Sequence, residues 1–125
     1  MTLTIVDSTV LIDASRSLPV ALRFLRDAAA AGPVASSVLV RTDLWVGARP
    51  DERARISGLF DQIEWHDVTL LLADLAASLG EPYRRSHRIE TVDLILAATV
   101  IEFGGTLATL NVRDFPMFPG LQPPY

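Results

Sequence analysis

Two carboxylates lie in one continuous helix and strand unit, residues 89–115. Asp93 falls in the first turn of an expected helix with Thr91 as its N-cap, where free N–H groups and the helix dipole favour a negative charge. Gly104-Gly105 ends that helix, and a short apolar strand follows. Asp114 comes after the carboxyl end of this strand, which is where chemistry sits in open α/β sheets. The unit therefore predicts a site built on carboxylates.

The residue types of the whole chain narrow the chemistry of such a site. All 11 basic residues are arginine, so no lysine can serve as a P-loop residue, a Schiff base or a general base. Cysteine is absent, which excludes a thiol nucleophile, a disulfide framework and cysteine-ligated zinc. The net charge of −4 argues against binding nucleic acid through bulk charge alone. Local basic clusters could still bind it.

Strands and helices alternate along the chain. Strands are expected at Thr2–Val6, Val34–Ser36, Ile63–Val68 and Thr106–Leu110, and helices at 10–14, 20–31, from 37, 51–60, 69–79 and from 91. The alternation predicts one α/β domain, residues 1–125, with a mostly parallel sheet of four to five strands covered on both faces. The proline-rich tail after Phe115 has room for one short edge strand.

The expected topology gives the acids different positions. Asp7 ends the first strand and lies at a carboxyl end, the edge to which Asp114 also belongs. Asp43 lies about two turns into its helix and can point inward. For Asp93 we expect a helix start near the opposite end of the sheet, unless the preceding segment carries it across. Periodicity alone leaves that point open.

Three segments and their order resemble the PIN-domain nucleases, in particular the VapC-type toxins of bacterial toxin–antitoxin pairs. The segments are IVDSTVLID, SVLVRTDLWVG and ETVDLILAATVIEFGGTLATLNVRDF, and the likeness covers nearly the whole chain. The resemblance implies a PIN-like three-layer α/β/α sandwich. It also implies an endoribonuclease that uses Mg²⁺, or Mn²⁺, to hydrolyse phosphodiester bonds in tRNA or rRNA and inhibits translation when free of antitoxin.

The resemblance assigns a role to each acid. Asp7 matches the first acid of the family, Asp93 the third and Asp114 the variable fourth. The second acid is usually a glutamate, six residues after a serine that starts the helix, and here Asp43 stands six residues after Ser37. Because Asp43 is one methylene shorter, we expect it to reach a metal less easily. Weaker or more manganese-dependent activity would follow.

A cluster of acids explains why such a site needs a cation. Carboxylates within about 4 Å of each other repel by roughly 4 kcal/mol per pair at an effective dielectric of about 20. A hard divalent cation relieves that repulsion, lowers the pKa of a bound water and stabilises a leaving oxygen. Hydrolysis of a phosphodiester is the chemistry that this arrangement favours.

Neighbouring polar residues are candidates for supporting roles. Candidates for orienting the acids or their waters are Ser8, Thr109 and Asn111, which could instead only satisfy backbone groups. Candidates for an RNA-binding rim are Arg84, Arg85 and Arg88, for which a solvated helix end is the alternative.

The resemblance also implies partners. They are an RNA substrate, a second copy in a homodimer, and a cognate VapB-type antitoxin lying against the helix hairpin 38–60. The start of the chain is unlike a signal peptide and no apolar run is long enough to span a bilayer, so we expect a cytoplasmic protein without a membrane partner.

Two other functions stay open. One is a non-catalytic PIN-fold module that binds RNA or a partner protein. The other is an aspartate-based phosphatase or receiver-like domain, which is a poor fit because those proteins normally use a lysine.

Overall fold

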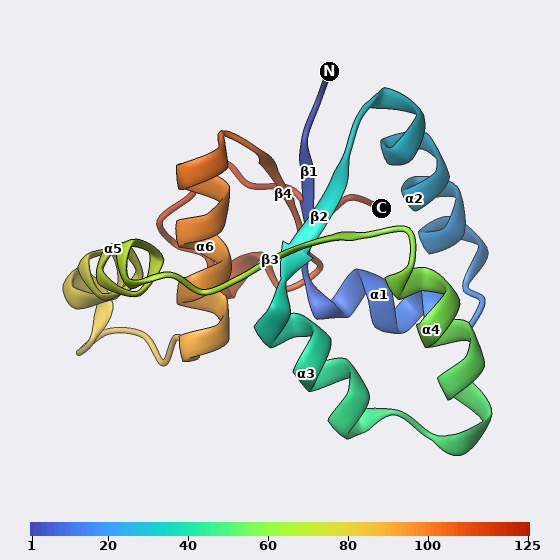
Figure 1. Ribbon diagram of the computed structural model, residues 1–125. Coiled ribbons are helices and arrows are strands. Elements are labelled where there is room, and N and C mark those ends of the chain that lie inside the picture. Colours follow the sequence, from blue (N-terminus) through green and yellow to red (C-terminus); the bar gives the residue numbers. More distant parts are fainter.

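The computed structural model describes residues 1–125 and is organised around a parallel sheet (Figure 1). The strands are β1 (Thr4–Val6), β2 (Val34–Ser37), β3 (Glu64–His66) and β4 (Thr106–Ala108). Their order is β3-β2-β1-β4, and every neighbouring pair is parallel. The predicted α/β class and parallel sheet are confirmed, with four strands, although the outer strands are shorter than expected.

Helices fill each connection between strands. They are α1 (Ser8–Ser15), α2 (Pro19–Ala31), α3 (Val38–Gly47), η1 (Pro50–Glu52), α4 (Arg53–Phe60), α5 (Leu70–Gly80), η2 (Glu81–Tyr83), α6 (Thr91–Phe103) and η3 (Val112–Asp114). In Figure 1, α5 and α6 lie on one side of the sheet, and α1, α2 and α4 pack together on the other. The predicted three-layer arrangement is therefore confirmed. None of these helices has the length and apolar character needed to span a bilayer.

Short polar side chains mark the starts of three helices. The Asp7 carboxylate accepts the Ser8 N–H at 2.8 Å, and the Ser37 hydroxyl accepts the Leu39 N–H at 3.2 Å. The Thr69 hydroxyl accepts the Leu72 N–H at 3.1 Å. Each of these bonds satisfies a backbone donor that the helix itself cannot pair, which fixes where the helix begins.

Several predicted boundaries are wrong. The N-cap of α6 is Glu90 rather than Thr91, and its side chain makes no capping hydrogen bond. The helix predicted at 51–60 begins as η1, which contains Asp51, and α4 starts only at Arg53. The tail after Phe115 forms no strand, although Phe118 and Leu121 pack against the core. Its prolines lack the N–H groups that a strand would need, and the tail is held by this packing and by the Tyr125 hydroxyl, which donates to the Asp13 carboxylate at 2.7 Å.

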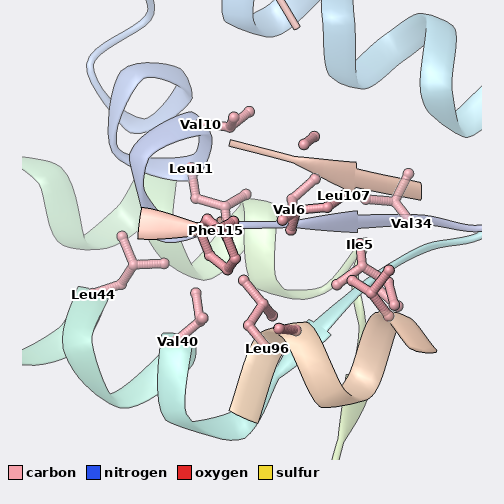
Figure 2. Packing of buried hydrophobic residues seen from close by; sticks show 14 of the residues in the cluster. Ile5, Val6, Val10, Leu11, Val34, Val40, Leu44, Leu96, Leu107 and Phe115 are labelled. Carbon is pink, nitrogen blue, oxygen red and sulfur yellow. The ribbon is translucent and has the colours of Figure 1, made fainter. Parts of the chain in front are cut away.

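The main core lies where β1 meets helices from both layers. Figure 2 shows the Phe115 ring among side chains of Val6 in β1, Leu11 in α1 and Leu96 in α6. Phe115 is 1% exposed, and removing a buried ring of this size typically costs about 3–5 kcal/mol. Because Phe115 directly follows Asp114, this packing anchors the loop that carries the acid.

The direction of α6 differs from the sequence expectation. Gly104, in the left-handed conformation at φ 70°, ends α6 and leads at once into β4. Since β4 is parallel to β1, a helix joined to it by so short a turn must run antiparallel to both strands. The start of α6 therefore lies at the carboxyl edge of the sheet, near the beginning of α1 in Figure 1. The expected position at the opposite end is wrong.

Candidate active site

Asp7 is the most deeply buried of the four predicted acids. It follows β1 and is 3% exposed. Its carboxylate accepts hydrogen bonds from the Thr109 hydroxyl at 2.7 Å, the Ser8 N–H at 2.8 Å and the Thr9 hydroxyl at 3.3 Å. The Asp7 N–H donates to the carbonyl of Ala108 at 2.9 Å, which joins the ends of β1 and β4. The position of this carboxylate is thus set from two strands.

Two threonines connect Asp7 to the loop after β4. The Thr9 hydroxyl accepts the Leu110 N–H at 3.1 Å, and the Thr109 hydroxyl accepts the Asn111 N–H at 3.0 Å. Asn111 takes part through its backbone, since its side chain is exposed. Thr9 was not among the residues predicted to orient the acids. Its place two residues after Asp7 was the available signal for this role.

Asp93 lies half-buried in the first turn of α6. Burial raises the pKa of Asp93 to about 7, with further contributions, in decreasing order, from the charges of Asp7, Asp114, Glu90 and Asp43. Exposed charges are largely screened beyond roughly 10 Å, so an effect of these charges on the pKa indicates that the acids lie in the neighbourhood of Asp93. The four acids predicted from sequence are therefore brought to one region of the carboxyl edge.

Asp114 and Asp43 reach this region from two further elements. Asp114 is half-buried in η3 and lines a hollow of about 380 Å³ over residues 110–114. Asp43 is exposed on α3 and lines a smaller hollow of about 60 Å³ together with Arg16 and Glu52. Asp43 also raises the pKa of Asp93 least of the four neighbouring acids. It is the most peripheral of the predicted acids.

Glu90 is an acid that no sequence prediction included. It is the exposed N-cap of α6, and its charge raises the pKa of Asp93 more than that of Asp43 does. Glu90 precedes Asp93 by three residues, a spacing that brings side chains together on a helix. That spacing was the signal that could have identified it.

The carboxylates of these acids are suitable ligands for a hard divalent cation, but their side chains are not placed to coordinate one. No group of three or more Asp, Glu or His side chains stands close enough together to hold a metal ion. None of the salt bridges involves Asp7, Asp43, Asp93 or Asp114. The candidate ligands are carboxylate oxygens, which Mg²⁺ prefers. No ion pair within the protein neutralises their charge. Rotation of exposed and half-buried side chains towards Asp7 would be needed to complete a coordination shell.

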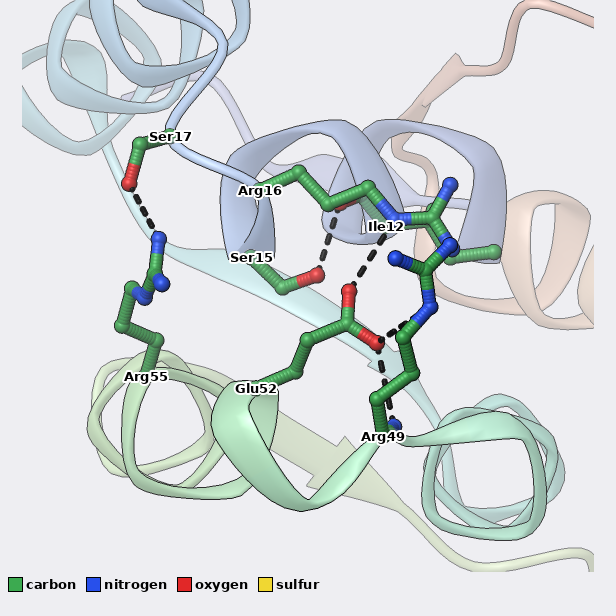
Figure 3. A network of polar contacts seen from close by, with 7 residues as sticks. All are labelled: Ile12, Ser15, Arg16, Ser17, Arg49, Glu52 and Arg55. Carbon is green, nitrogen blue, oxygen red and sulfur yellow. Dashed lines mark hydrogen bonds and ion pairs between the residues drawn. The ribbon is translucent and has the colours of Figure 1, made fainter.

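Arg16, which lines the same hollow as Asp43, is paired with Glu52 (Figure 3). The Glu52 carboxylate accepts the Arg49 N–H at 3.0 Å and Arg16 Nε at 3.0 Å, and it is 5% exposed. These hydrogen bonds, with the Arg49 bond contributing most, hold the pKa of Glu52 below its usual value. The network joins the end of α1 to the α3–α4 hairpin.

The residues of the predicted arginine rim do not line the hollows that contain Asp43 and Asp114. Arg84, Arg85 and Arg88 are all exposed in the segment between η2 and α6. Arg84 and Arg88 line a separate cavity beside the start of α6, and Arg85 does not.

Known proteins resemble the chain in both sequence and fold. It is 42% identical to "Ribonuclease VapC19" of Mycobacterium tuberculosis over 123 residues, which are 97% of this chain and 98% of that protein. It is 39% identical to "Ribonuclease VapC10" of the same organism over 122 residues, 97% of this chain and 92% of the other. No protein-family model matches the chain.

Solved structures share the fold at lower identity. VapBC2 from Rickettsia felis, bound to a DNA fragment from its promoter, matches with a TM-score of 0.81 and 19% identity over 96% of each chain. A toxin–antitoxin complex from Klebsiella pneumoniae matches with a TM-score of 0.79 and 24% identity over 98% of each chain. The sequence identity to the two mycobacterial proteins extends over nearly the whole chain and confirms the resemblance that the motifs indicate. The chain belongs to the VapC ribonuclease family.

Proposed function

We propose that the chain is a metal-dependent endoribonuclease, the toxin of a toxin–antitoxin pair, which cleaves tRNA or rRNA and inhibits translation when free of its antitoxin. The observation that carries this proposal is the gathering of Asp7, Asp43 and Asp114 around Asp93 at one edge of the sheet, where burial and, after it, the charges of these acids raise the pKa of Asp93. Membership of the VapC ribonuclease family supports it.

The residues of the proposed site have different roles. Asp7 and Asp93 would hold Mg²⁺ or Mn²⁺, with Asp114 directly and Asp43 directly or through a water as further ligands. When bound, the cation activates a water and stabilises negative charge at the reacting phosphate. Thr9 and Thr109 orient Asp7 through their hydroxyl groups. Before the cation arrives, protonation of Asp93 near neutral pH lowers the repulsion among the acids.

An RNA substrate needs an attractive surface beside these acids. The exposed guanidinium groups of Arg84, Arg85 and Arg88 supply positive charge next to the start of α6. Arginine binds phosphate through two parallel hydrogen bonds, and such contacts position a nucleic acid without reading its sequence. The rim provides positive charge locally on a chain whose net charge is −4.

The proposed partner is a VapB-type antitoxin, because fold neighbours include VapBC complexes. Uncompensated acids attract a basic side chain for the same reason that they attract a cation. The α3–α4 hairpin is the proposed contact surface, and it carries Val46, which is 82% exposed. We further propose a cytoplasmic homodimer.

One observation favours the alternative of a non-catalytic RNA- or partner-binding module. No group of three ligands is already positioned to hold a metal, and Asp43 replaces the longer glutamate usual in the resemblance. Titration calorimetry with Mn²⁺ separates the two functions. Binding that is lost in Asp7→Asn supports the nuclease, whereas no binding at millimolar Mn²⁺ supports the module.

Sequencing RNA ends after induced expression tests the activity directly. We expect new 5′ ends at a specific site in a tRNA or rRNA with the wild-type chain, and none with Asp93→Asn at equal protein level. Incubation of the purified chain with RNA should reproduce the cut, and EDTA should prevent it. Cleavage that persists in both Asp7→Asn and Asp93→Asn would contradict the site assignment.

A further inference from the structure

The largest hollow in the molecule lies between the end of α5 and the start of α6. Its volume is about 500 Å³, and it is lined by α5, the connection through η2 to Ile89, and Leu94. Sites for small ligands typically enclose about 300–1,000 Å³. Leu94 directly follows Asp93, so this cavity and one of the acids share the first turn of α6.

The rim of this cavity carries cations without partners. Arg84 and Arg88 line it, and neither takes part in any of the salt bridges of the chain. Both are exposed, so their guanidinium groups are available to a ligand. A planar guanidinium matches the geometry of a phosphate oxygen pair. The rim therefore favours an anionic ligand.

The wall of the cavity is aromatic and held in a defined turn. The rings of Tyr83 and His87 meet edge to face, with centroids 5.3 Å apart and planes at 86°. The N–H groups of Ser86 and His87 both donate to the Tyr83 carbonyl, at 3.1 and 2.9 Å. The Ser86 hydroxyl lies 2.7 Å from His87 Nδ1. Aromatic rings fixed in this way are typical stacking surfaces for unpaired bases.

The floor is apolar, and one glycine sets its shape. Ala77, Ile89 and Leu94 contribute the apolar surface. A Cβ at Gly80 would lie 2.7 Å from Leu94 Cδ1, so Gly80 allows α5 to approach α6 closely. Glu81 adds a carboxylate, which repels phosphate but accepts hydrogen bonds from the amino groups of bases. A site for phosphate alone would need neither the apolar floor nor this acceptor.

We propose that this cavity, the base pocket, binds one unpaired nucleotide of the RNA substrate beside the cleavage site, and this inference rests on the proposed nuclease function. The base enters against Tyr83 and His87, and Glu81 accepts from its amino group. Arg84 and Arg88 bind the adjoining phosphate. The base pocket thereby contributes to the choice of RNA, while the acids contribute the chemistry.

Binding of a labelled single-stranded RNA to the Asp93→Asn chain, without divalent metal and over a range of salt, tests the base pocket. Adding Arg84→Ala and Arg88→Ala should weaken binding about 10- to 30-fold and reduce the salt slope by about 1.4, since each phosphate contact on a single strand contributes about 0.7. Tyr83→Ala should weaken binding about 5- to 10-fold without changing the slope, and Tyr83→Phe should restore it.

A matched control removes the same charge elsewhere. Arg23 and Arg26 are exposed on α2, in the other helical layer, and Arg23→Ala with Arg26→Ala should leave affinity nearly unchanged. Thermal melts of all variants check that they are folded. An equal loss of affinity in the α2 control would attribute binding to bulk charge and overturn the base pocket.

The outcomes also separate this inference from the proposed function. If the wild-type chain cleaves RNA and the Arg84/Arg88 and Tyr83 variants bind and cleave like it, the base pocket is overturned and the nuclease stands. If the wild-type chain cleaves nothing while the same variants lose RNA binding, the base pocket stands and the nuclease fails. Absence of RNA binding by the Asp93→Asn chain at low salt overturns the base pocket.

Discussion

Glu52 and Asp93 lie in opposite electrostatic environments within one small domain. Glu52 is almost fully buried, and hydrogen bonds from Arg49 and Arg16 hold its pKa below the usual value. Asp93 is half-buried beside other acids and has no cationic partner, so its pKa rises to about 7. The same chain therefore compensates one carboxylate and leaves another uncompensated.

This difference distinguishes an acid that stabilises the fold from acids that are available for chemistry. Glu52 joins α1 to the α3–α4 hairpin, and its charge is neutralised within the protein (Figure 3). The acids around Asp93 contribute little to holding elements together, apart from Asp7, and their charge remains available to a ligand. Acids that repel one another in a folded protein are candidates for function. The comparison identifies the carboxyl edge as the reactive region.

The largest effect should come from removing an acid at the reactive edge. We expect Asp7→Asn or Asp93→Asn to lower the rate of metal-dependent RNA cleavage by about 10²-fold or more, because each removes a ligand charge from the cation. Initial rates on a labelled RNA measure this. Asp61→Asn, at an exposed position after α4, should cleave normally, and a similar loss there would break the comparison.

Removing the compensated acid should affect stability instead. Glu52→Ala leaves Arg16 and the Arg49 N–H without their acceptor, and we expect Tm to fall by several degrees. Glu102→Ala, an exposed acid on α6, is the control and should have little effect. Unchanged Tm in Glu52→Ala would show that the network is not structural.

The pH dependence of stability should follow the lowered pKa of Glu52. Stability from this group is fully present above the unfolded pKa near 4.5 and is lost as the pH falls through the lower folded value. Glu52→Gln should therefore flatten the decline in Tm below about pH 4.5. Parallel curves for the variant and the wild type would contradict this assignment.

The pH dependence of stability that comes from Asp93 should have the opposite sign to that from Glu52. The pKa of the Asp93 carboxyl is about 7 in the folded chain and near 3.8 in the unfolded chain. Its contribution to the free energy of unfolding therefore falls as the pH rises between these values. With solvent screening, we expect Asp93→Asn without metal to be about 1 kcal/mol more stable than the wild type at pH 8 and equal near pH 4. Urea unfolding in EDTA measures the difference, and a destabilised variant at pH 8 would refute the repulsion.

The smallest effect should come from lengthening the peripheral acid. Asp43→Glu restores the missing methylene, and we expect a roughly 3- to 10-fold lower Mg²⁺ requirement for cleavage, with less change for Mn²⁺. Magnesium titration of the cleavage rate checks this. A higher requirement would mean that Asp43 already reaches the cation and that the longer chain disturbs the site.

Local sequence signals were sufficient for the sheet and for Asp7. Short apolar strands alternate with helices, and the acid follows the first strand directly, so its place at the carboxyl edge follows from chain order. The start of α6 was misplaced because periodicity gives no direction in space. The short turn at Gly104 sets that direction.

The partner of each long-range contact was beyond reach from sequence, although Thr109 was already a candidate for orienting an acid. The pairing of Arg16 with Glu52 spans 36 residues, and that of Thr109 with Asp7 spans 102. Hydrogen bonds of this kind depend on which side chains the fold brings together, and local spacing carries no record of them. Glu90 and Thr9 were overlooked for a different reason, since both also serve as ordinary residues at the start of a helix.

The most direct test of the reactive edge is anomalous diffraction from crystals of the wild-type chain soaked in Mn²⁺. We expect a manganese peak at bonding distance from the carboxylates of Asp7 and Asp93, with Asp114 or Asp43 bound directly or through water. The corresponding Asp93→Asn crystal should lack it. A wild-type crystal with no peak between these acids at millimolar Mn²⁺, or with one only at other carboxylates, would contradict the account.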